Sequence, residues 1–97
     1  MTMIINKKLE QDTLIFAPVG RLDTVTAGEF ESELMASLEG VASLVLDFQD
    51  VAYVSSAGLR VILKAQKRMS NMKITGANAM VMEVFEITGF ADILNLE

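Results

Sequence analysis

The sequence predicts a small α/β domain, with a mixed sheet of four or five strands and helices packed on it. Short apolar or alternating runs, which are typical of strands, alternate along the chain with segments whose apolar residues recur at helical spacing. No linker, repeat or low-complexity segment divides the 97 residues, so we expect a single domain over residues 1–97. A hydrophobic content of 52% is ample for one core.

Two strands are predicted at the start of the chain, over residues 3–9 and 13–19, joined by a hairpin turn at residues 11–12. Pro18 has no amide donor, so its part of the second strand is expected near an edge or a bulge. Residues 20–23, Gly-Arg-Leu-Asp, are expected to form the loop that leaves this strand.

The first helix is predicted from a candidate cap followed by apolar residues at helical spacing. Thr26 and Glu29 have the spacing of a capping box, in which each side chain satisfies the other residue's free donor. Gly40 is expected to end the helix as a left-handed cap. The residues expected on the apolar stripe are Ala27, Phe30, Leu34 and Leu38.

The middle of the chain continues the alternation. Residues 43–48 are short, apolar and partly β-branched, which is typical of a buried central strand. A second strand-like apolar run reaches Val54 and ends in a loop, where a pair of serines opens a helix that continues to about Arg68. The inward-facing residues of this helix are expected to be Leu59, Ile62 and Met69.

A short strand over residues 73–76 and a helix over residues 78–88 are predicted next. The apolar stripe of that helix is expected at Met80, Val84 and Ile87. Gly89 and Phe90 fit a helix end whose next residue folds back on the core, and residues 93–96 fit a last short strand or a final turn. The seven methionines are expected mainly to fill gaps in the core.

Composition excludes several classes of function. The chain has no cysteine and no histidine, so thiolate chemistry, disulfides, the commonest general base and the commonest zinc ligands are absent. We therefore expect no enzyme activity, no metal and no cofactor. A net charge of −5 and a pI near 4.6 argue against nucleic acid as a direct partner. The amino terminus lacks signal-peptide order and no apolar run could span a bilayer, so a cytoplasmic protein is expected.

Ser55 and Ser56 open the second long helix, where unpaired N–H groups and the positive end of the helix dipole favour an anion. Ser56 can cap the helix by accepting from the N–H of Gly58 or Leu59, or it can accept a phosphate. The two interpretations are compatible. Gly58 fits either a close approach by a phosphate or partner, or tight packing against a neighbouring strand.

Basic residues form one stripe along the same helix, at Arg60, Lys64, Lys67 and Arg68. A solvated face is the simple explanation. The stripe is nevertheless unusual in an acidic protein and begins one turn from Ser56. We hypothesise that it meets an acidic patch on a partner, and that Arg60 can reach a phosphate on Ser56.

Several segments together resemble the STAS domain, and more narrowly the free-standing anti-sigma-factor antagonists. The segments are Gly20–Asp23, Thr24–Ala27, Leu46–Phe48, Val51–Leu59 and Glu86–Phe90. The resemblance covers nearly the whole chain and implies one STAS-like domain.

The resemblance implies a partner-switching role. Family members bind an anti-sigma factor that is also a serine kinase; the kinase phosphorylates one serine, and a serine phosphatase resets the complex. The family's acceptor position corresponds to Ser56, with Ser55 as second choice. Asp23, which alone is typical of a turn residue bonding its own backbone, is placed by the family beside the acceptor loop. With the basic stripe, the predicted partner-binding surface comprises Asp23, Thr24, Ser55, Ser56, Ala57, Gly58, Arg60, Lys64 and Lys67.

The chain departs from the family pattern at three positions. Ser55 replaces the usual aspartate and removes a negative charge beside the acceptor, Ala57 replaces serine or threonine, and Arg60 replaces glycine. An alternative function therefore stays open: a STAS scaffold, or an accessory subunit of a lipid transporter, that binds its partner constitutively. A small enzyme or phosphocarrier is the third class, and the lack of histidine and cysteine disfavours it.

Overall fold

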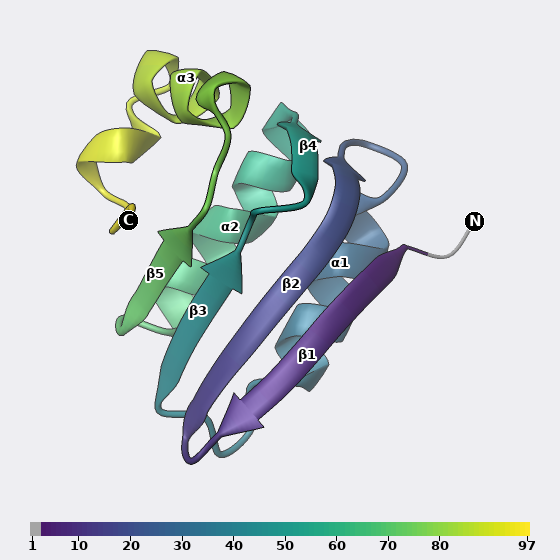
Figure 1. Cartoon of the computed structure of the whole chain (residues 1–97), viewed down its shortest axis with the longest axis vertical. Helices are drawn as coiled ribbons and strands as arrows, with labels where there is room; N and C mark the ends of the chain where they lie inside the picture. Colours follow the sequence, from purple (N-terminus) through teal and green to yellow (C-terminus); the bar gives the residue numbers. More distant parts are fainter. Residues whose placement is uncertain (1–2) are drawn as a thin grey trace.

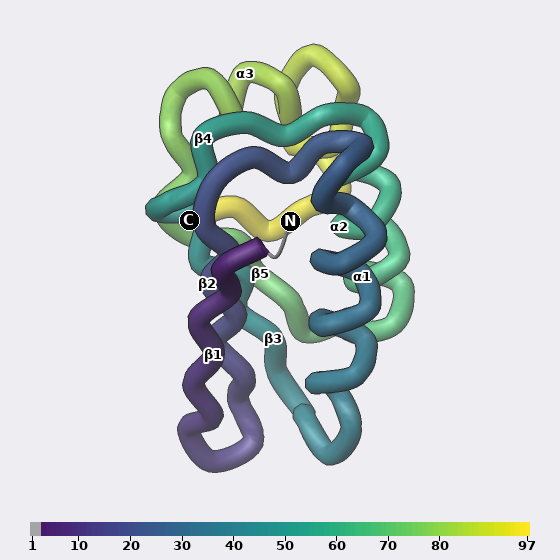
Figure 2. Tube along the Cα trace, turned by 90° about the vertical axis from the view of Figure 1, so that its right-hand side faces the viewer, coloured from purple at the N-terminus to yellow at the C-terminus, as the bar shows by residue number. Residues whose placement is uncertain are grey.

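The computed structural model describes residues 3–97 and confirms the α/β prediction (Figure 1). Within this range the order is β1 (Ile4–Glu10), β2 (Thr13–Leu22), α1 (Ala27–Ala36), β3 (Ser43–Asp47), β4 (Val51–Val54), α2 (Ser56–Arg68), β5 (Met72–Thr75), α3 (Ala79–Ile87) and the 3₁₀ turn η1 (Phe90–Asp92). The five strands form a mixed sheet in the order β1-β2-β3-β5, with β4 paired to the far end of β2. Both α1 and α2 lie on one face of the sheet, while α3 lies at its end, against β4 (Figure 2).

The predicted hairpin is confirmed. β1 and β2 pair antiparallel from Ile4↔Val19 to Glu10↔Thr13, and Gln11 in the turn has φ +58°. The remaining pairings, β2 with β3, β2 with β4 and β3 with β5, are all parallel.

The predicted loop at residues 20–23 was wrong for its first three residues, which extend β2. Gly20 pairs with Val51 and Leu22 with Val54, and the register shifts between Gly20 and Arg21. Gly20 has φ +104°, so the turn-like composition here encodes a bulge inside a strand. The strand forms because β4, which is distant in sequence, supplies hydrogen-bonding partners.

Pro18 lies close to this bulge, as predicted. It falls between the last β2–β3 pair, Phe16↔Leu46, and the first β2–β4 pair, Gly20↔Val51. Because neither parallel ladder includes residue 18, the missing amide donor of Pro18 removes no hydrogen bond from them.

The apolar stripe of α1 is confirmed: Ala27, Phe30, Leu34 and Leu38 are all buried. The capping box was wrong. The Thr26 hydroxyl donates to the Arg21 carbonyl at 2.6 Å and accepts from the Asp23 amide at 3.0 Å. Glu29 is turned away, toward β1. Gly40 does have φ +77°, but the helix ends at Ala36, so Gly40 shapes the turn beyond the helix.

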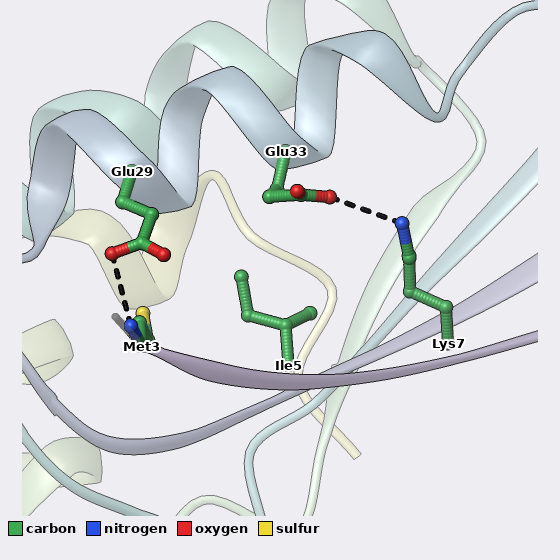
Figure 3. Close-up of a pocket in the computed structure, with 5 residues that line it drawn as sticks. All are labelled: Met3, Ile5, Lys7, Glu29 and Glu33. Carbon is green, nitrogen blue, oxygen red and sulfur yellow. Dashed lines mark hydrogen bonds and ion pairs between the residues drawn. The ribbon is translucent and has the colours of Figure 1, made fainter.

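Carboxylates of α1 connect this helix to its neighbours on both sides. Glu29 accepts from the Met3 amide at 2.9 Å, and Glu33 pairs with Lys7 of β1 at 3.0 Å (Figure 3). On the other side, Glu31 pairs with Lys64 of α2 at 3.1 Å. Exposed pairs such as these add little stability, but they fix where the charges of α1 point.

The core lies between the sheet and the helices. Phe16 and Phe30 meet there with ring centroids 5.9 Å apart, and the inward side chains predicted for α2 are buried. The C-terminal part also behaves as predicted: Gly89 has φ +80° and Phe90 packs against the core. Leu96 forms a single parallel bridge with Ile74 of β5.

Of the stripe predicted to face the core on α3, Val84 is partly buried and packs against the core, but the prediction was wrong for Met80 and Ile87. Val81 and Phe85 are buried instead, with Phe85 stacked on Phe48 at 6.5 Å. Met80 is 58% and Ile87 76% exposed, so Met80 does not fill the core either. Apolar residues occupy both sides of this helix, so spacing alone could not select the inner one. None of the helices within residues 3–97 has the length and apolar character needed to cross a membrane.

Among the glycines, Gly58 of α2 has the closest neighbours, and these belong to β2 and β4. A Cβ at this position would lie 2.8 Å from the Leu22 carbonyl oxygen and 3.1 Å from a Val54 methyl carbon. Of the two interpretations left open by the sequence, the structure therefore supports tight packing.

We expect Gly58→Ala to destabilise the protein by about 1–3 kcal/mol, because the added methyl group must push α2 away from β2. Urea unfolding at equilibrium measures this loss. Gly28→Ala in α1 is the matched control, since a Cβ there meets nothing within 4 Å. The control should be neutral or stabilising by up to about 1 kcal/mol, and equal effects of the two variants would contradict the packing argument.

Candidate functional site

The loops that follow β2 and β4 lie side by side because the two strands pair in parallel. Leu22 is the register partner of Val54, and the Ser55 amide donates to the Leu22 carbonyl at 2.8 Å. The turn containing Asp23 and the start of α2 therefore lie at the same edge of the sheet. The structure thus brings together the two segments that the sequence predicted to share a site.

Ser56 is exposed and is the first residue inside α2. The prediction that Ser56 caps the helix was wrong, because Ser55 occupies the N-cap position with extended backbone angles, φ −93° and ψ 178°. The first helical hydrogen bond runs from the Leu59 amide to the Ser55 carbonyl at 2.9 Å. Ser56 is therefore free of the capping role that its sequence position suggested.

Ser55 differs sharply from Ser56 in accessibility. Its Oγ is buried and finds no hydrogen-bond partner within the described residues, and its side chain makes no capping bond. The amides of the first turn of α2 are consequently not satisfied by this side chain and stay available to an anion.

Asp23 organises the turn between β2 and α1. Its Oδ1 accepts from the amides of Val25 at 3.0 Å and Thr26 at 3.2 Å, and its other carboxylate oxygen lies 3.5 Å from Nε of Arg21. Desolvation opposes ionisation, but the hydrogen bonds from Thr26, Val25 and Arg21 outweigh it and lower the pKa of the Asp23 carboxyl. The local turn interpretation is confirmed, and the side chain is held as a carboxylate.

Arg21 and Tyr53 add a contact that the sequence did not reveal. The Arg21 guanidinium lies 4.6 Å from the centre of the Tyr53 ring, and the two residues are register partners of β2 and β4. The contact was missed because Arg21 had been assigned to a loop. Recognising the β2–β4 pairing would have placed the two residues side by side.

The basic stripe of α2 exists as predicted, with Arg60, Lys64, Lys67 and Arg68 all exposed. Lys64 is already paired with Glu31. Among residues 3–97, the other three form no ion pair. Positive charge available to a partner is therefore concentrated at the two ends of the stripe.

Two hollows lie near α1 and the turn of Asp23 on the described part of the surface. A groove of about 430 Å³ beside Asp23 is lined mostly by apolar atoms, including those of Ile4, Val19 and Val25. A smaller one of about 210 Å³ lies between α1 and β1 (Figure 3), and both of its carboxylates already accept a hydrogen bond there. Over the described range, no group of three or more acidic side chains is arranged to hold a metal ion.

Comparison with known proteins identifies the family to which this domain is related. The family model of the STAS domain matches residues 5–97. BtrV of Bordetella bronchiseptica, a proposed anti-sigma factor antagonist, is 36% identical over 82% of this chain and 73% of its own. The anti-sigma-B factor antagonist of Listeria monocytogenes is 30% identical over 94% of this chain and 84% of its own.

Solved structures agree with the fold. The crystal structure of an anti-sigma factor antagonist from Mycobacterium paratuberculosis superposes with a TM-score of 0.89 at 17% identity, over 98% of this chain and 85% of the other. The phosphorylated form of the Bacillus protein SpoIIAA gives a TM-score of 0.72 at 12% identity, over 97% and 91% of the two chains. At these identities the likeness concerns the fold.

We expect Ser55→Ala to leave the free energy of unfolding unchanged or to raise it, because the substitution removes a buried hydroxyl without a partner. If Ser55 capped the helix through its side chain, the same substitution would instead lower the free energy of unfolding by about 1 kcal/mol. The control is Asn78→Ala, since the Asn78 side chain does cap α3 by accepting from the Val81 amide at 2.8 Å. Urea unfolding should show a loss of about 1 kcal/mol or more for the control alone. A comparable loss of unfolding free energy for Ser55→Ala would contradict the conclusion that the Ser55 hydroxyl has no hydrogen-bond partner.

The ionised Asp23 carboxylate should stabilise the turn fully at pH values above 3.8, the usual pKa of the group. This stabilisation should be lost as the pH falls through the lowered pKa of Asp23 in the folded chain. The folded pKa is depressed, so protonation on acidification removes the charge that the amides and Arg21 favour. We expect the stability difference between the native chain and Asp23→Asn to shrink on acidification below 3.8. Thermal unfolding between neutral and acid pH measures it, and a difference independent of pH would contradict the assignment.

Proposed function

The chain belongs to the STAS domain family, and on this premise we propose that it is an anti-sigma factor antagonist switched by phosphorylation of Ser56. Its partners would be an anti-sigma factor that is also a serine kinase, and a serine phosphatase that resets the switch. It would act in the cytoplasm as a ligand and substrate, with no catalytic activity of its own.

The observation that carries the proposal is the difference between the two serines. Ser56 is exposed at the start of α2, beside the turn of Asp23, whereas the Ser55 Oγ is buried. A kinase must bring its phosphate donor to the hydroxyl oxygen, so accessibility favours Ser56. The spacing in the family motif independently favours the same residue.

The start of α2 suits a phosphorylated residue. A phosphoserine carries about −1.5 to −2 charges at neutral pH, and at Ser56 it would lie where the helix dipole and the free amides of the first turn favour an anion. Arg60 follows one turn later, with its side chain exposed, and can approach the phosphate. The domain can thus accept the phosphate without refolding.

The effect on binding would arise at the interface. A surface fitted to a neutral serine must bury a dianion without a partner, which is costly, and acidic groups opposite it would add repulsion. Couplings of about 1–3 kcal/mol are ordinary for such switches. Phosphorylation would therefore release the partner while leaving this chain folded.

The proposed partner surface follows the candidate site. Asp23, Thr24, Ser56 and Ala57 lie at the edge where β2 and β4 end, and Arg60, Lys64 and Lys67 extend it along α2. Gly58 is buried, and the Ser55 hydroxyl is too; Gly58 and the backbone amide of Ser55, which donates to the Leu22 carbonyl, would shape the surface by fixing the position of α2.

The alternative is a STAS scaffold, or an accessory subunit of a lipid transporter, that binds constitutively. The feature that favours it is Ser55 at the position where the family commonly has aspartate. Loss of that charge beside the acceptor would weaken recognition by a kinase. The two functions differ in whether Ser56 ever carries phosphate.

We expect the protein recovered from its native cells to carry a single phosphate on Ser56 whose occupancy changes between growth and stress. Intact-mass measurement and peptide mapping would show it. Ser56→Ala should abolish the modification, and Ser56→Asp should weaken recovery of the partner in pull-downs by about tenfold or more. Ser55→Ala, the matched control, should change neither.

Phosphate on Ser55, with Ser56 unmodified, would overturn the site assignment. No phosphate under any condition, together with an unchanged pull-down for Ser56→Asp, would favour the constitutive binding module instead.

A further inference from the structure

Helix α3 is apolar on two sides, and only one of them is used by the fold. Its inner side buries Val81 and Phe85. On its outer side, Met80 is 58% and Ile87 76% exposed. Val84 lies between them, partly buried and packed against the core, so only part of it faces outward. A spacing of four and three residues places these three side chains in one line along the helix.

We call Met80, Val84 and Ile87, together with the neighbouring exposed Glu83 and Glu86, the outer α3 face. Single exposed apolar side chains are common on soluble proteins, but an aligned set rimmed by charged residues marks an interaction surface. The outer α3 face therefore has the character of a docking surface.

The charge around this face has one sign. Residues 74–97 contain Glu83, Glu86, Asp92 and Glu97 and no lysine or arginine. Glu97 is paired with Lys73 at 3.4 Å, and the other three form no ion pair within the described residues. A complementary ligand must therefore combine apolar and basic side chains.

We propose that the outer α3 face binds a basic amphipathic helix of a partner protein. Such a helix would lay apolar side chains along Met80, Val84 and Ile87, in the manner of helix-in-groove recognition. Its lysines or arginines would meet Glu83 and Glu86 at the rim, which steers association and fixes register. Flexible methionine side chains allow the contact to adapt to the ligand.

Charge disfavours the two other occupants. A second copy docking through the same helix would bring Glu83 and Glu86 opposite their own equivalents, with like-charge repulsion. An anionic membrane surface attracts lysine and arginine, which α3 lacks.

The outer α3 face is separate from the candidate site around Ser56. The Asn78 side chain, which caps α3, donates to the carbonyl of Val51, the first residue of β4, at 3.1 Å. Ser55 and Ser56 follow the last residue of that strand (Figure 1). The face and the candidate site thus belong to different helices, and we expect a ligand on α3 to bind whatever the phosphorylation state of Ser56.

The probe is a synthetic helical peptide of about 18 residues, long enough to be helical alone, with leucine on one face and lysine on the other. We expect titration into the ¹⁵N-labelled full chain to shift the amide resonances of residues 79–93. Binding should weaken as salt rises. A peptide with every lysine replaced by glutamate should not bind.

Met80→Ser combined with Ile87→Ser should weaken binding of the lysine peptide by about tenfold to a hundredfold, since two apolar side chains leave the contact. Both positions are exposed, so the fold should persist, and a thermal melt checks it. Leu9→Ser is the matched control, because Leu9 is 63% exposed on β1. Ser56→Asp should leave peptide binding unchanged.

Four results would overturn the proposal. They are shifts confined to α2 or the candidate site, equal binding of the glutamate peptide, binding of anionic vesicles that is lost in the double variant, and a dimer in sedimentation that is lost in the same variant. The last two would assign the face to a membrane or to a second copy.

Discussion

The contact between the start of α2 and the end of β2 is the constraint on which the rest of the structure depends. The Leu22 carbonyl accepts from the Ser55 amide at 2.8 Å, and the same oxygen would lie only 2.8 Å from a Cβ on Gly58. Only glycine lets the helix come this close. The approach fixes the first turn of α2 beside the turn of Asp23. It also leaves the Ser55 Oγ buried while Ser56 faces solvent.

Most of the fold follows from local pattern because each helix and strand must bury one side. The stripe of α1 was sufficient to predict that helix and its inner residues Ala27, Phe30 and Leu34, and the short apolar run at residues 43–48 was sufficient to predict β3. Prediction failed where a distant partner decides the structure. Residues 20–22 have the composition of a turn but become strand because β4 pairs with them. Likewise, Glu29 does not take its expected capping role because it accepts from the amide of Met3, the residue just before β1.

The candidate site was predictable in its location but not in the division of roles within it. The position of Ser55 and Ser56 at the start of a helix made both serines candidates, and the resemblance to the family favoured Ser56 as the acceptor. Sequence alone could not show which serine occupies the N-cap, since that depends on the backbone angles imposed where β4 ends. The Arg21–Tyr53 contact was equally hidden, because it requires the parallel register of two strands that lie far apart in the sequence.

The charges of this acidic chain are sorted by element, which gives a small domain two distinct surfaces. Four of the eight lysine and arginine residues lie on α2, whose first residue is Ser56, while the segment from α3 to residue 97 has acidic residues and no lysine or arginine. The basic surface of α2 would attract acidic ligands and the acidic surface of α3 would attract basic ones, so charge alone can direct two partners to different surfaces. Under the proposed function, phosphate on Ser56 would act mainly on the positive field of α2, in whose first turn it would lie, since screening limits its reach to about 8–10 Å. If both proposals hold, the domain would keep one partner on α3 while it exchanges another at Ser56.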